Sequence, residues 1–271
     1  MRIGIVANIH IDKSLGAFQH LKELLQGEAR SFLPESLDEL NDKTGASCEF
    51  FSSIDVVVVL GGDGTILSVA RVAAVYDVPI LGVNLGQIGF LSEVETDNLA
   101  YAARRLLEGE YSYDSRFLLR AQHGDRSFLA VNEVAVVRKQ FSRIISAQIQ
   151  INGSYYQTVC GDGVIVATPT GSTAYSLSAG GPLLCPDVDC VVVTPACSHT
   201  LSVRPLVVSR DSKIEISVDI RRGKEAYVAF DGQRGCRIDG PVSICCAQER
   251  AKFIRLKEYD FFALMQGKLP E

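Results

Sequence analysis

The sequence of 271 residues has no apolar run long enough to cross a bilayer, and its first residues lack the charged, then apolar, then small order of a secretion signal. None of its eight cysteines forms a Cys-x-x-Cys pair, so we expect free thiols in a reducing compartment, with a metal cluster as the less favoured alternative. It has no basic run, and its formal net charge is −5, which argues against a general nucleic-acid binder. These absences predict a cytoplasmic protein with no membrane or nucleic-acid partner.

Several enzyme signatures are also missing. The absence of Gly-x-x-x-x-Gly-Lys-Ser/Thr excludes a P-loop enzyme, and the absence of Gly-x-Gly-x-x-Gly excludes the usual dinucleotide fingerprint. Protein-kinase signatures, a nucleophile elbow and His-Glu-x-x-His do not occur either. What is present is an ordinary globular composition, 47% hydrophobic and 22% charged, in a chain long enough for one large domain or two small ones.

In the first part of the chain, short apolar runs alternate with apolar residues at helical spacing. Strands are predicted over 3–7, 55–60 and 79–84, and helices over 14–26, 65–76 and 97–108. This alternation is typical of an open parallel sheet, so we predict an α/β domain over residues 1–110.

From about residue 113 the pattern changes to many short strands separated by turn residues. The strands are predicted over 117–122, 128–138, 145–151, 155–159, 164–168, 189–194, 206–209, 213–220, 226–230 and 242–245. The turns are predicted at Gly124-Asp125, Asn152-Gly153, Asp231-Gly232 and Asp239-Gly240. This spacing indicates an all-β sandwich over residues 111–257, and we expect the apolar tail, residues 258–271, to pack back on the first domain.

The most informative local feature is Gly61-Gly62-Asp63-Gly64-Thr65, where a buried strand ends and a helix begins. Ligands of open α/β sheets bind beyond the carboxyl ends of the strands, and glycines let backbone N–H groups approach phosphate oxygens. Asp63 would then present a carboxylate that takes a proton from a hydroxyl or helps to hold a metal. The plain structural alternative is a glycine-rich turn with Asp63 as the helix N-cap.

A second unusual stretch begins at Gly161-Asp162-Gly163 and runs through an apolar strand into a loop dense in hydroxyls and glycines, residues 168–182. The loop suits phosphate and ribose, Asp162 could accept bonds from an amide or a ribose hydroxyl, and Tyr175 offers a ring to stack on a base. The alternative is a Ser/Thr-rich turn before a capped helix, with Tyr175 in a core. Asn132 and Glu133 lie inside a predicted strand. They are either the solvent-facing polar residues of an alternating strand pattern or a pair that binds a ligand.

In their order along the chain, these motifs and residues 198–208 (SHTLSVRPLVV) resemble the NAD kinase family, and the resemblance covers nearly the whole chain. GGDGT alone also resembles motifs of diacylglycerol kinases, sphingosine kinases and phosphofructokinases, whereas TPTGSTAYSLSAGGP with Asn-Glu upstream points to NAD kinase. The resemblance implies a Rossmann-like first domain, a β-sandwich second domain and a site between them. It implies phosphorylation of the 2′-hydroxyl of the adenosine ribose of NAD, with ATP or polyphosphate as donor, a divalent metal ion (Mg²⁺ expected), and a homodimer or homotetramer.

By match to the family's motifs, Asp63 is the catalytic proton acceptor and Gly64 lines the same pocket. Asn132 and Glu133 match residues that hold the adenosine part of NAD, and Asp162 matches a carboxylate at the other end of the dinucleotide. The remaining expected NAD contacts are Thr173, Ala174, Tyr175, Ser178, Arg143 and Gln233, the last two with less distinctive flanking residues. Backbone N–H groups around 61–65 and 171–173 are expected to balance phosphate charge, and no residue is predicted as a metal ligand.

Two other classes of function stay open. A lipid or sugar kinase could share GGDGT, although the sequence shows no acyl-accommodating surface and no sugar-phosphate pocket. A non-catalytic NAD-sensing protein would keep the dinucleotide residues and lose Asp63 or the phosphate loop, and both are present here.

Overall fold

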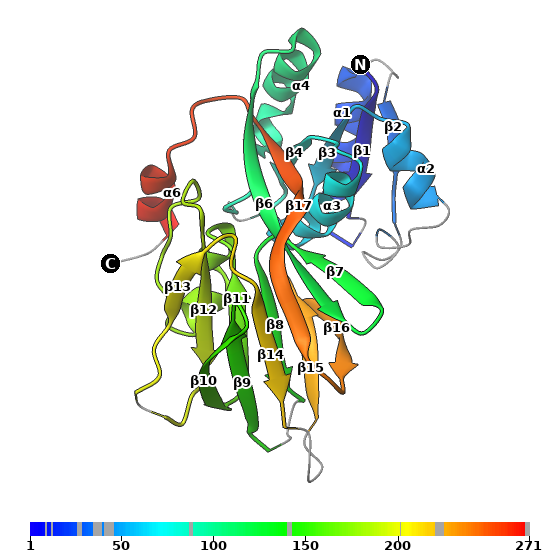
Figure 1. Ribbon diagram of the computed structural model, residues 1–271. Coiled ribbons are helices and arrows are strands. Elements are labelled where there is room, and N and C mark those ends of the chain that lie inside the picture. The colour runs from blue at the N-terminus through cyan, green and yellow to red at the C-terminus, as the bar shows by residue number, and fades with distance from the viewer. Residues whose placement is uncertain are drawn as a thin grey trace. The chain divides into compact units, whose positions relative to one another are not determined.

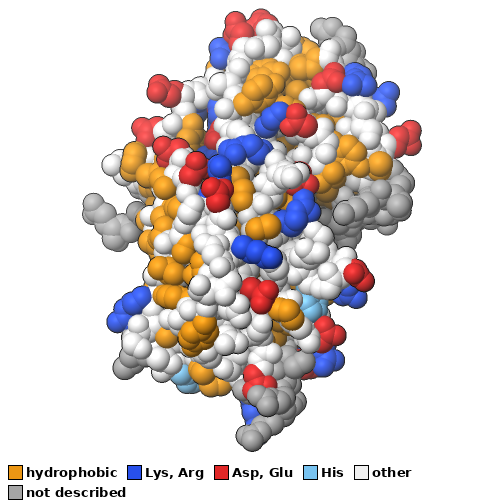
Figure 2. Space-filling model, in the orientation of Figure 1, with side chains coloured by type: hydrophobic (Ala, Val, Ile, Leu, Met, Phe, Trp, Pro, Cys, Tyr) orange, Lys and Arg blue, Asp and Glu red, His pale blue; other side chains and the backbone are white. Residues whose placement is uncertain are grey.

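The computed structural model describes residues 1–8, 10–11, 13–25, 29–34, 40, 46–86, 89–139, 143–200, 202–219 and 225–268. Four parts of the predicted elements and motifs, at Gln26, Leu201, Ile220 and 269–271, lie outside these residues. The chain divides into two compact units, Met1–Arg116 with Glu249–Glu271 and Phe117–Gln248. Within the described residues, no helix is both long enough and apolar enough to cross a membrane. On the face shown in Figure 2, acidic and basic side chains are interspersed.

The first unit is built on a parallel sheet in the strand order β2-β1-β3-β4 (Figure 1). Its strands are β1 (Ile3–Ala7), β2 (Ala29–Phe32), β3 (Val56–Leu60), β4 (Ile80–Asn84) and β5 (Val94–Glu95), and the last part of β17 (Val242–Arg255) pairs with β4. Its helices are α1 (Ser14–Leu24), α2 (Ala46–Ser52), α3 (Asp63–Val75), α4 (Leu99–Glu108) and α6 (Phe261–Lys268), with a 3₁₀ turn, η2 (Thr96–Asn98), before α4.

Helices cover both faces of this sheet, which is why β1, β3 and β4 are buried at every position and read as unbroken apolar runs. On one face, side chains such as Ile5 share a core with Leu21 of α1 and Leu106 of α4. On the other face, a Cβ at Gly4 or Gly82 would lie within 3 Å of side chains from the α2 and α3 region, so these strands approach their helices closely. The predicted α/β architecture is confirmed.

The second unit contains two antiparallel sheets whose inner faces share one core. One sheet has the order β13-β12-β11-β8-β15-β16, and the other contains β10-β9-β14-β17 together with the hairpin β6-β7. The bounds are β6 (Ser112–His123), β7 (Arg126–Ala130), β8 (Glu133–Arg138), β9 (Ile145–Ile151), β10 (Ser154–Gly161), β11 (Gly163–Ala167), β12 (Cys190–Ala196), β13 (Leu206–Ser209), β14 (Ile214–Val218), β15 (Ala226–Phe230) and β16 (Gln233–Ile238). The predicted β-sandwich is therefore confirmed.

Several predicted elements differ from the structure. β2, α2 and β16 were not predicted, and the predicted strand 128–138 is two strands separated by a bend at Val131 and Asn132. β17 extends ten residues beyond the predicted 242–245, because this part of the strand also pairs with β6 and β4. Arg250 in its polar middle bonds the side chain and carbonyl of Ser115 on β6. The sequence pattern changes near residues 110 and 257, whereas the two compact units divide inside β6 and β17.

Candidate functional site

The glycine-rich turn after β3 leads directly into α3 in the first unit. α3 begins at Asp63, two residues before the predicted start, and its N-cap is Gly62, so the alternative that Asp63 caps the helix is wrong. A Cβ at Gly61 would lie 2.7 Å from the Thr65 side chain, which restricts that position to glycine. The N–H groups of Gly61 and Thr65 are bonded to the Val83 and Gly62 carbonyls, each at 3.0 Å, so the expectation that these two N–H groups balance phosphate charge is wrong. The first i to i−4 bond of α3 runs from the Ile66 N–H to the Gly62 carbonyl at 3.1 Å, and the start of a helix suits an anion.

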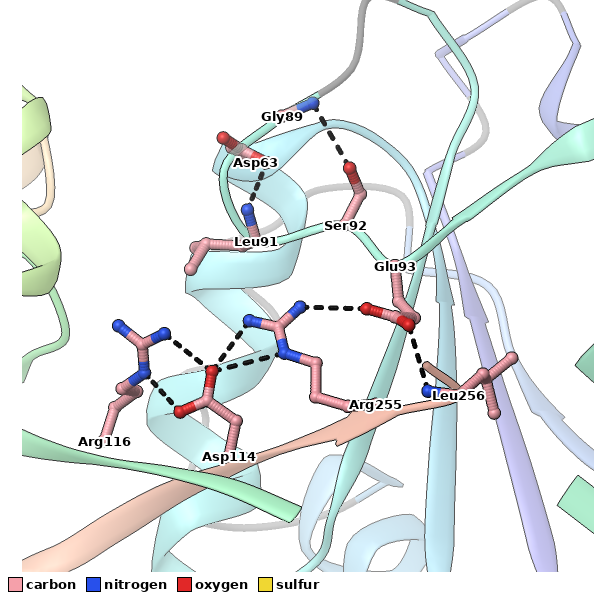
Figure 3. A network of polar contacts seen from close by, with 9 residues as sticks. All are labelled: Asp63, Gly89, Leu91, Ser92, Glu93, Asp114, Arg116, Arg255 and Leu256. Carbon is pink, nitrogen blue, oxygen red and sulfur yellow. Dashed lines mark hydrogen bonds and ion pairs between the residues drawn. The ribbon is translucent and has the colours of Figure 1, made fainter. Parts of the chain in front are cut away.

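The Asp63 carboxylate is held by the loop that follows β4. Its Oδ2 accepts a hydrogen bond from the Phe90 N–H at 2.7 Å. Its Oδ1 accepts one from the Leu91 N–H at 3.3 Å, which Figure 3 shows. Gly89 lies so close that a Cβ there would overlap the carboxylate. Because an ionised carboxylate offers about four lone-pair positions, Asp63 can still accept a further hydrogen bond from a hydroxyl.

The second unit contains a pocket of about 350 Å³. It is lined by Glu133, Ala135, Val137, Arg138, Asp162, Tyr175, Ala229 and Gly232. Three of the predicted NAD contacts, Glu133, Asp162 and Tyr175, thus meet at one pocket although they are distant in the sequence. Tyr175 is 43% exposed, so the alternative that places it in a core is wrong.

Asp231, which was not predicted as a site residue, shapes the wall that carries Glu133. Its carboxylate accepts hydrogen bonds from the backbone N–H groups of Val131 at 3.1 Å, Asn132 at 2.7 Å and Glu133 at 3.3 Å. Asp231 and Gly232 have φ values of 51° and 66°, as the predicted hairpin turn requires. Because Asp231 binds three successive backbone N–H groups, the chain bends at Val131 and Asn132. This bend explains why the predicted strand 128–138 is divided into two strands.

Glu133 is a buried residue, only 3% exposed. Burial raises its pKa to about 8, and the negative charge of Asp231 adds to the increase, while the N–H groups of Gly232 and Tyr175 oppose it. Oε2 has no hydrogen-bond partner among the described residues. At neutral pH Glu133 is therefore mostly uncharged. The alternative that it is a solvent-facing residue on the polar side of its strand is wrong.

Asp162 is fixed at the pocket by Arg138, which sequence reasoning missed. The Arg138 Nε donates to Asp162 Oδ1 at 2.6 Å, and the Arg138 N–H donates to the Asp162 carbonyl at 2.9 Å. The glycine after Asp162 is required by space, because a Cβ at Gly163 would overlap the Val136 carbonyl. The one feature of the sequence that could have identified Arg138 as a site residue is its position as a charged residue at the end of an apolar strand.

The hydroxyl-rich loop contains η3 (Thr170–Thr173) and α5 (Tyr175–Ser178), and its hydroxyls mostly hold the loop itself. Thr168 Oγ1 donates to the Val131 carbonyl at 2.7 Å, and Ser176 Oγ lies 2.9 Å from Thr194 Oγ1. The N–H groups of Gly171 and Ser172 are bonded to Thr168 Oγ1 and the Pro169 carbonyl. The expectation that these two N–H groups balance phosphate charge is therefore wrong.

The other predicted contacts are distributed around this loop and pocket. A Cβ at Gly171 would overlap the backbone of Asn132, so the loop packs directly on that residue. Thr173, Ala174 and Ser178 flank Tyr175, and Gln233 follows the pocket residue Gly232 at the start of β16. Arg143 lies just before β9 and is not among the residues that line the pocket, and Asp63 and Gly64 belong to the first unit.

Two family models match the chain. The ATP-NAD kinase N-terminal domain matches residues 6–111, and the ATP-NAD kinase C-terminal domain matches residues 131–256. Among curated relatives, the NAD kinase of Thermoanaerobacter sp. (strain X514) is 37% identical over 284 residues, which cover 100% of this chain and 99% of the relative. The NAD kinase of Clostridium botulinum (strain Loch Maree / Type A3) is 37% identical over 272 residues, covering 98% and 95%.

Solved structures give the same result. The crystal structure of an NAD kinase from Archaeoglobus fulgidus in complex with ATP has a TM-score of 0.78 and 28% identity, and covers 99% of this chain and 98% of that chain. The yeast NADH kinase complexed with NADH has a TM-score of 0.84 and 24% identity, covering 99% and 87%, and at that identity it shows the fold alone.

Proposed function

The chain belongs to the NAD kinase family, and we propose that it transfers the terminal phosphoryl group of ATP to the 2′-hydroxyl of the adenosine ribose of NAD, giving NADP. The observation that carries this proposal is the placement of Asp63. It stands at the first position of a helix, after a glycine turn, with both carboxylate oxygens held by backbone N–H groups and lone pairs left for a hydroxyl.

In the proposed step, the ribose 2′-oxygen attacks the γ-phosphorus, and the bond from that phosphorus to the oxygen bridging it to the β-phosphorus breaks. The proton of the 2′-hydroxyl goes to the Asp63 carboxylate, and ADP leaves. A ribose hydroxyl is a weak acid, so Asp63 accepts the proton as the new bond forms rather than beforehand. Alignment and balance of charge supply most of the rate of phosphoryl transfer, and the positive end of the α3 helix dipole contributes to that balance.

We propose that the pocket of the second unit binds NAD through Glu133, Asp162 and Tyr175. The half-exposed Tyr175 ring offers a face for a base to stack on. Asp162, held by Arg138, presents its remaining lone pairs to amide or hydroxyl donors, and protonated Glu133 can donate a hydrogen bond. Asn132, Thr173, Ala174, Ser178 and Gln233 are proposed as flanking contacts, and Arg143 as a more distant one.

A divalent ion is expected for this chemistry. Among the described residues, no three His, Cys, Asp or Glu side chains gather as a metal-binding group. Mg²⁺ is commonly bound by nucleotide phosphates and water with one or two carboxylates, so these residues fit an ion that arrives with the donor rather than a resident protein site. MgATP, or magnesium polyphosphate, is therefore the proposed donor substrate. A homodimer or homotetramer is proposed from the family resemblance, and a cytoplasmic location from the expectation of free thiols in a reducing compartment.

The direct test is to incubate the purified protein with NAD, Mg²⁺ and either ATP or polyphosphate, and to look for NADP by chromatography. Phosphorus NMR of the product then distinguishes a 2′-phosphate from a 3′-phosphate. Diacylglycerol and fructose phosphate serve as competing acceptors, because a lipid or sugar kinase would phosphorylate these instead. Tight binding of NAD without any NADP would identify an NAD-sensing protein and would contradict the proposal.

A further inference from the structure

A line of buried charges in the first unit runs from the end of β17 to the loop that holds Asp63 (Figure 3). Arg255 Nη1 donates to Glu93 Oε2 at 3.1 Å, and the Leu256 N–H donates to Glu93 Oε1 at 2.9 Å. On its other side, Arg255 Nη2 donates to Asp114 Oδ2 at 2.8 Å, and Asp114 also accepts two bonds from Arg116. Two acids and two arginines make the network electrically neutral.

The network is unusually deep for charged side chains. The exposed fraction of the side chain is 6% for Glu93, 3% for Arg255 and 5% for Arg116. Burying charges costs desolvation energy, and replacing a buried ion pair by well-packed apolar residues is often neutral or stabilising. Stability alone therefore does not account for this arrangement, whereas a need to fix one backbone position would.

Glu93 directly follows residues 89–92, the segment whose backbone N–H groups bind the Asp63 carboxylate. The Glu93 N–H donates to the Gly82 carbonyl at 2.9 Å, and one residue earlier Ser92 Oγ accepts the Gly89 N–H at 3.2 Å. Phe90 and Leu91, between these two bonds, donate their N–H groups to the Asp63 carboxylate. The side chain of Glu93 thus anchors to β17 the same short segment that sets the orientation of Asp63.

The C-terminal tail adds contacts at both ends of this line. The ring of Tyr259 lies against the Arg255 guanidinium at 4.2 Å, and the Lys268 ammonium lies over the Phe90 ring at 4.8 Å, each measured to the ring centroid. Both are within the range of cation–π attraction. The tail therefore contacts the buried anchor and the residue that makes the shorter bond to Asp63.

We propose that Glu93 and Arg255 are positioning residues for phosphoryl transfer, which fix residues 89–92 and thereby hold the Asp63 carboxylate in its reactive orientation. The proposal rests on the proposed role of Asp63 as proton acceptor. Because a displacement of about 1 Å in a reacting group can cost about a hundredfold in rate, loss of the anchor should lower kcat far more than it raises KM.

The test is a double-mutant cycle with Glu93→Gln and Asp63→Asn, measured as kcat and KM for NAD and MgATP. In the wild-type background, Glu93→Gln should lower kcat about 10- to 100-fold and change each KM less than about threefold. In the Asp63→Asn background, the same substitution should lower kcat less than about twofold, because the group it positions is already inactive. A purely structural role would lower kcat by the same factor in both backgrounds and would overturn the inference.

Controls separate folding from positioning. Lys252 lies on β17, as Arg255 does, and Lys252→Met breaks its 2.7 Å contact with Asp77, in the turn between α3 and β4; this variant should leave kcat unchanged. If Glu93→Gln does not fold, the double variant Glu93→Met, Arg255→Met removes both charges and leaves Asp114 paired with Arg116. This variant should fold with a low kcat, and near wild-type kcat would overturn the inference. Wild-type activity of Asp63→Asn alone would instead contradict the proposed function, and the inference with it.

Discussion

Glu133→Gln tests the electrostatics of the pocket through the pH dependence of stability. Glutamine keeps one oxygen for the N–H groups of Gly232 and Tyr175, and its amide replaces Oε2, which has no partner among the described residues. The folded chain keeps the Glu133 proton up to about pH 8, whereas an unfolded glutamate releases it near 4.5. The stability contributed by the protonated group is therefore complete below about pH 4.5 and is lost as the pH rises to about 8.

The shift in pKa from 4.5 to about 8 corresponds to a loss of up to about 5 kcal/mol, at up to about 1.4 kcal/mol for each pH unit. Glu133→Gln has no such loss, so its stability should exceed that of the wild type by less than about 1 kcal/mol at pH 5, by an increasing amount up to about pH 8, and by a nearly constant amount beyond that. The assay is urea unfolding of both proteins at each pH from 5 to 9, because the difference between them cancels the other titrating groups. A difference in unfolding free energy that stays constant over this range would refute the reasoning.

Three further predictions concern the pocket and the residues that support it. Tyr175→Ala should weaken NAD binding by about 1–2 kcal/mol in a titration, because the stacking ring is lost. Tyr175→Phe keeps the ring and should bind NAD nearly as the wild type does. An unchanged NAD affinity of the alanine variant would exclude stacking. Gly171→Ala places a methyl group against the Asn132 backbone and should destabilise the fold by about 1–3 kcal/mol. The control is Gly16→Ala in α1, which has open space around it and should stabilise the fold by about 0.5–1 kcal/mol. Equal melting temperatures for the two variants would contradict this packing. Asp231→Asn removes the negative charge beside Glu133 and should lower the Glu133 pKa, as measured by NMR titration of that carboxyl group.

Local patterns were enough to predict much of the fold. The unbroken apolar runs of β1, β3 and β4 are visible in the sequence because these strands are covered on both faces. Asn152-Gly153 was identifiable as a hairpin turn, since both residues need a positive φ and have values of 52° and 80°. In contrast, β2 has a polar, half-buried sequence, Ala-Arg-Ser-Phe, which carries no strand signal of its own.

The parts of the site that were missed depend on contacts between residues distant in the sequence. Asp231 was identified only as a turn residue, because the N–H groups it binds lie 98 to 100 residues away along the chain. The ion pair between Glu93 and Arg255 is equally nonlocal, and neither residue belongs to a motif. The raised pKa of Glu133 follows from burial and from Asp231 together, so no local pattern could have predicted it.

The central claim is that Asp63 takes the proton of the ribose hydroxyl as phosphate is transferred. The most direct measurement is the rate of the chemical step in Asp63→Asn, followed by rapid quench with saturating NAD and MgATP. Because the amide oxygen of asparagine can still accept the shorter bond, from the Phe90 N–H, and only the longer bond from Leu91 is lost, the variant should stay folded and bind NAD normally. The account predicts NADP formation about two to four orders of magnitude slower than in the wild type, and a rate near that of the wild type would contradict it.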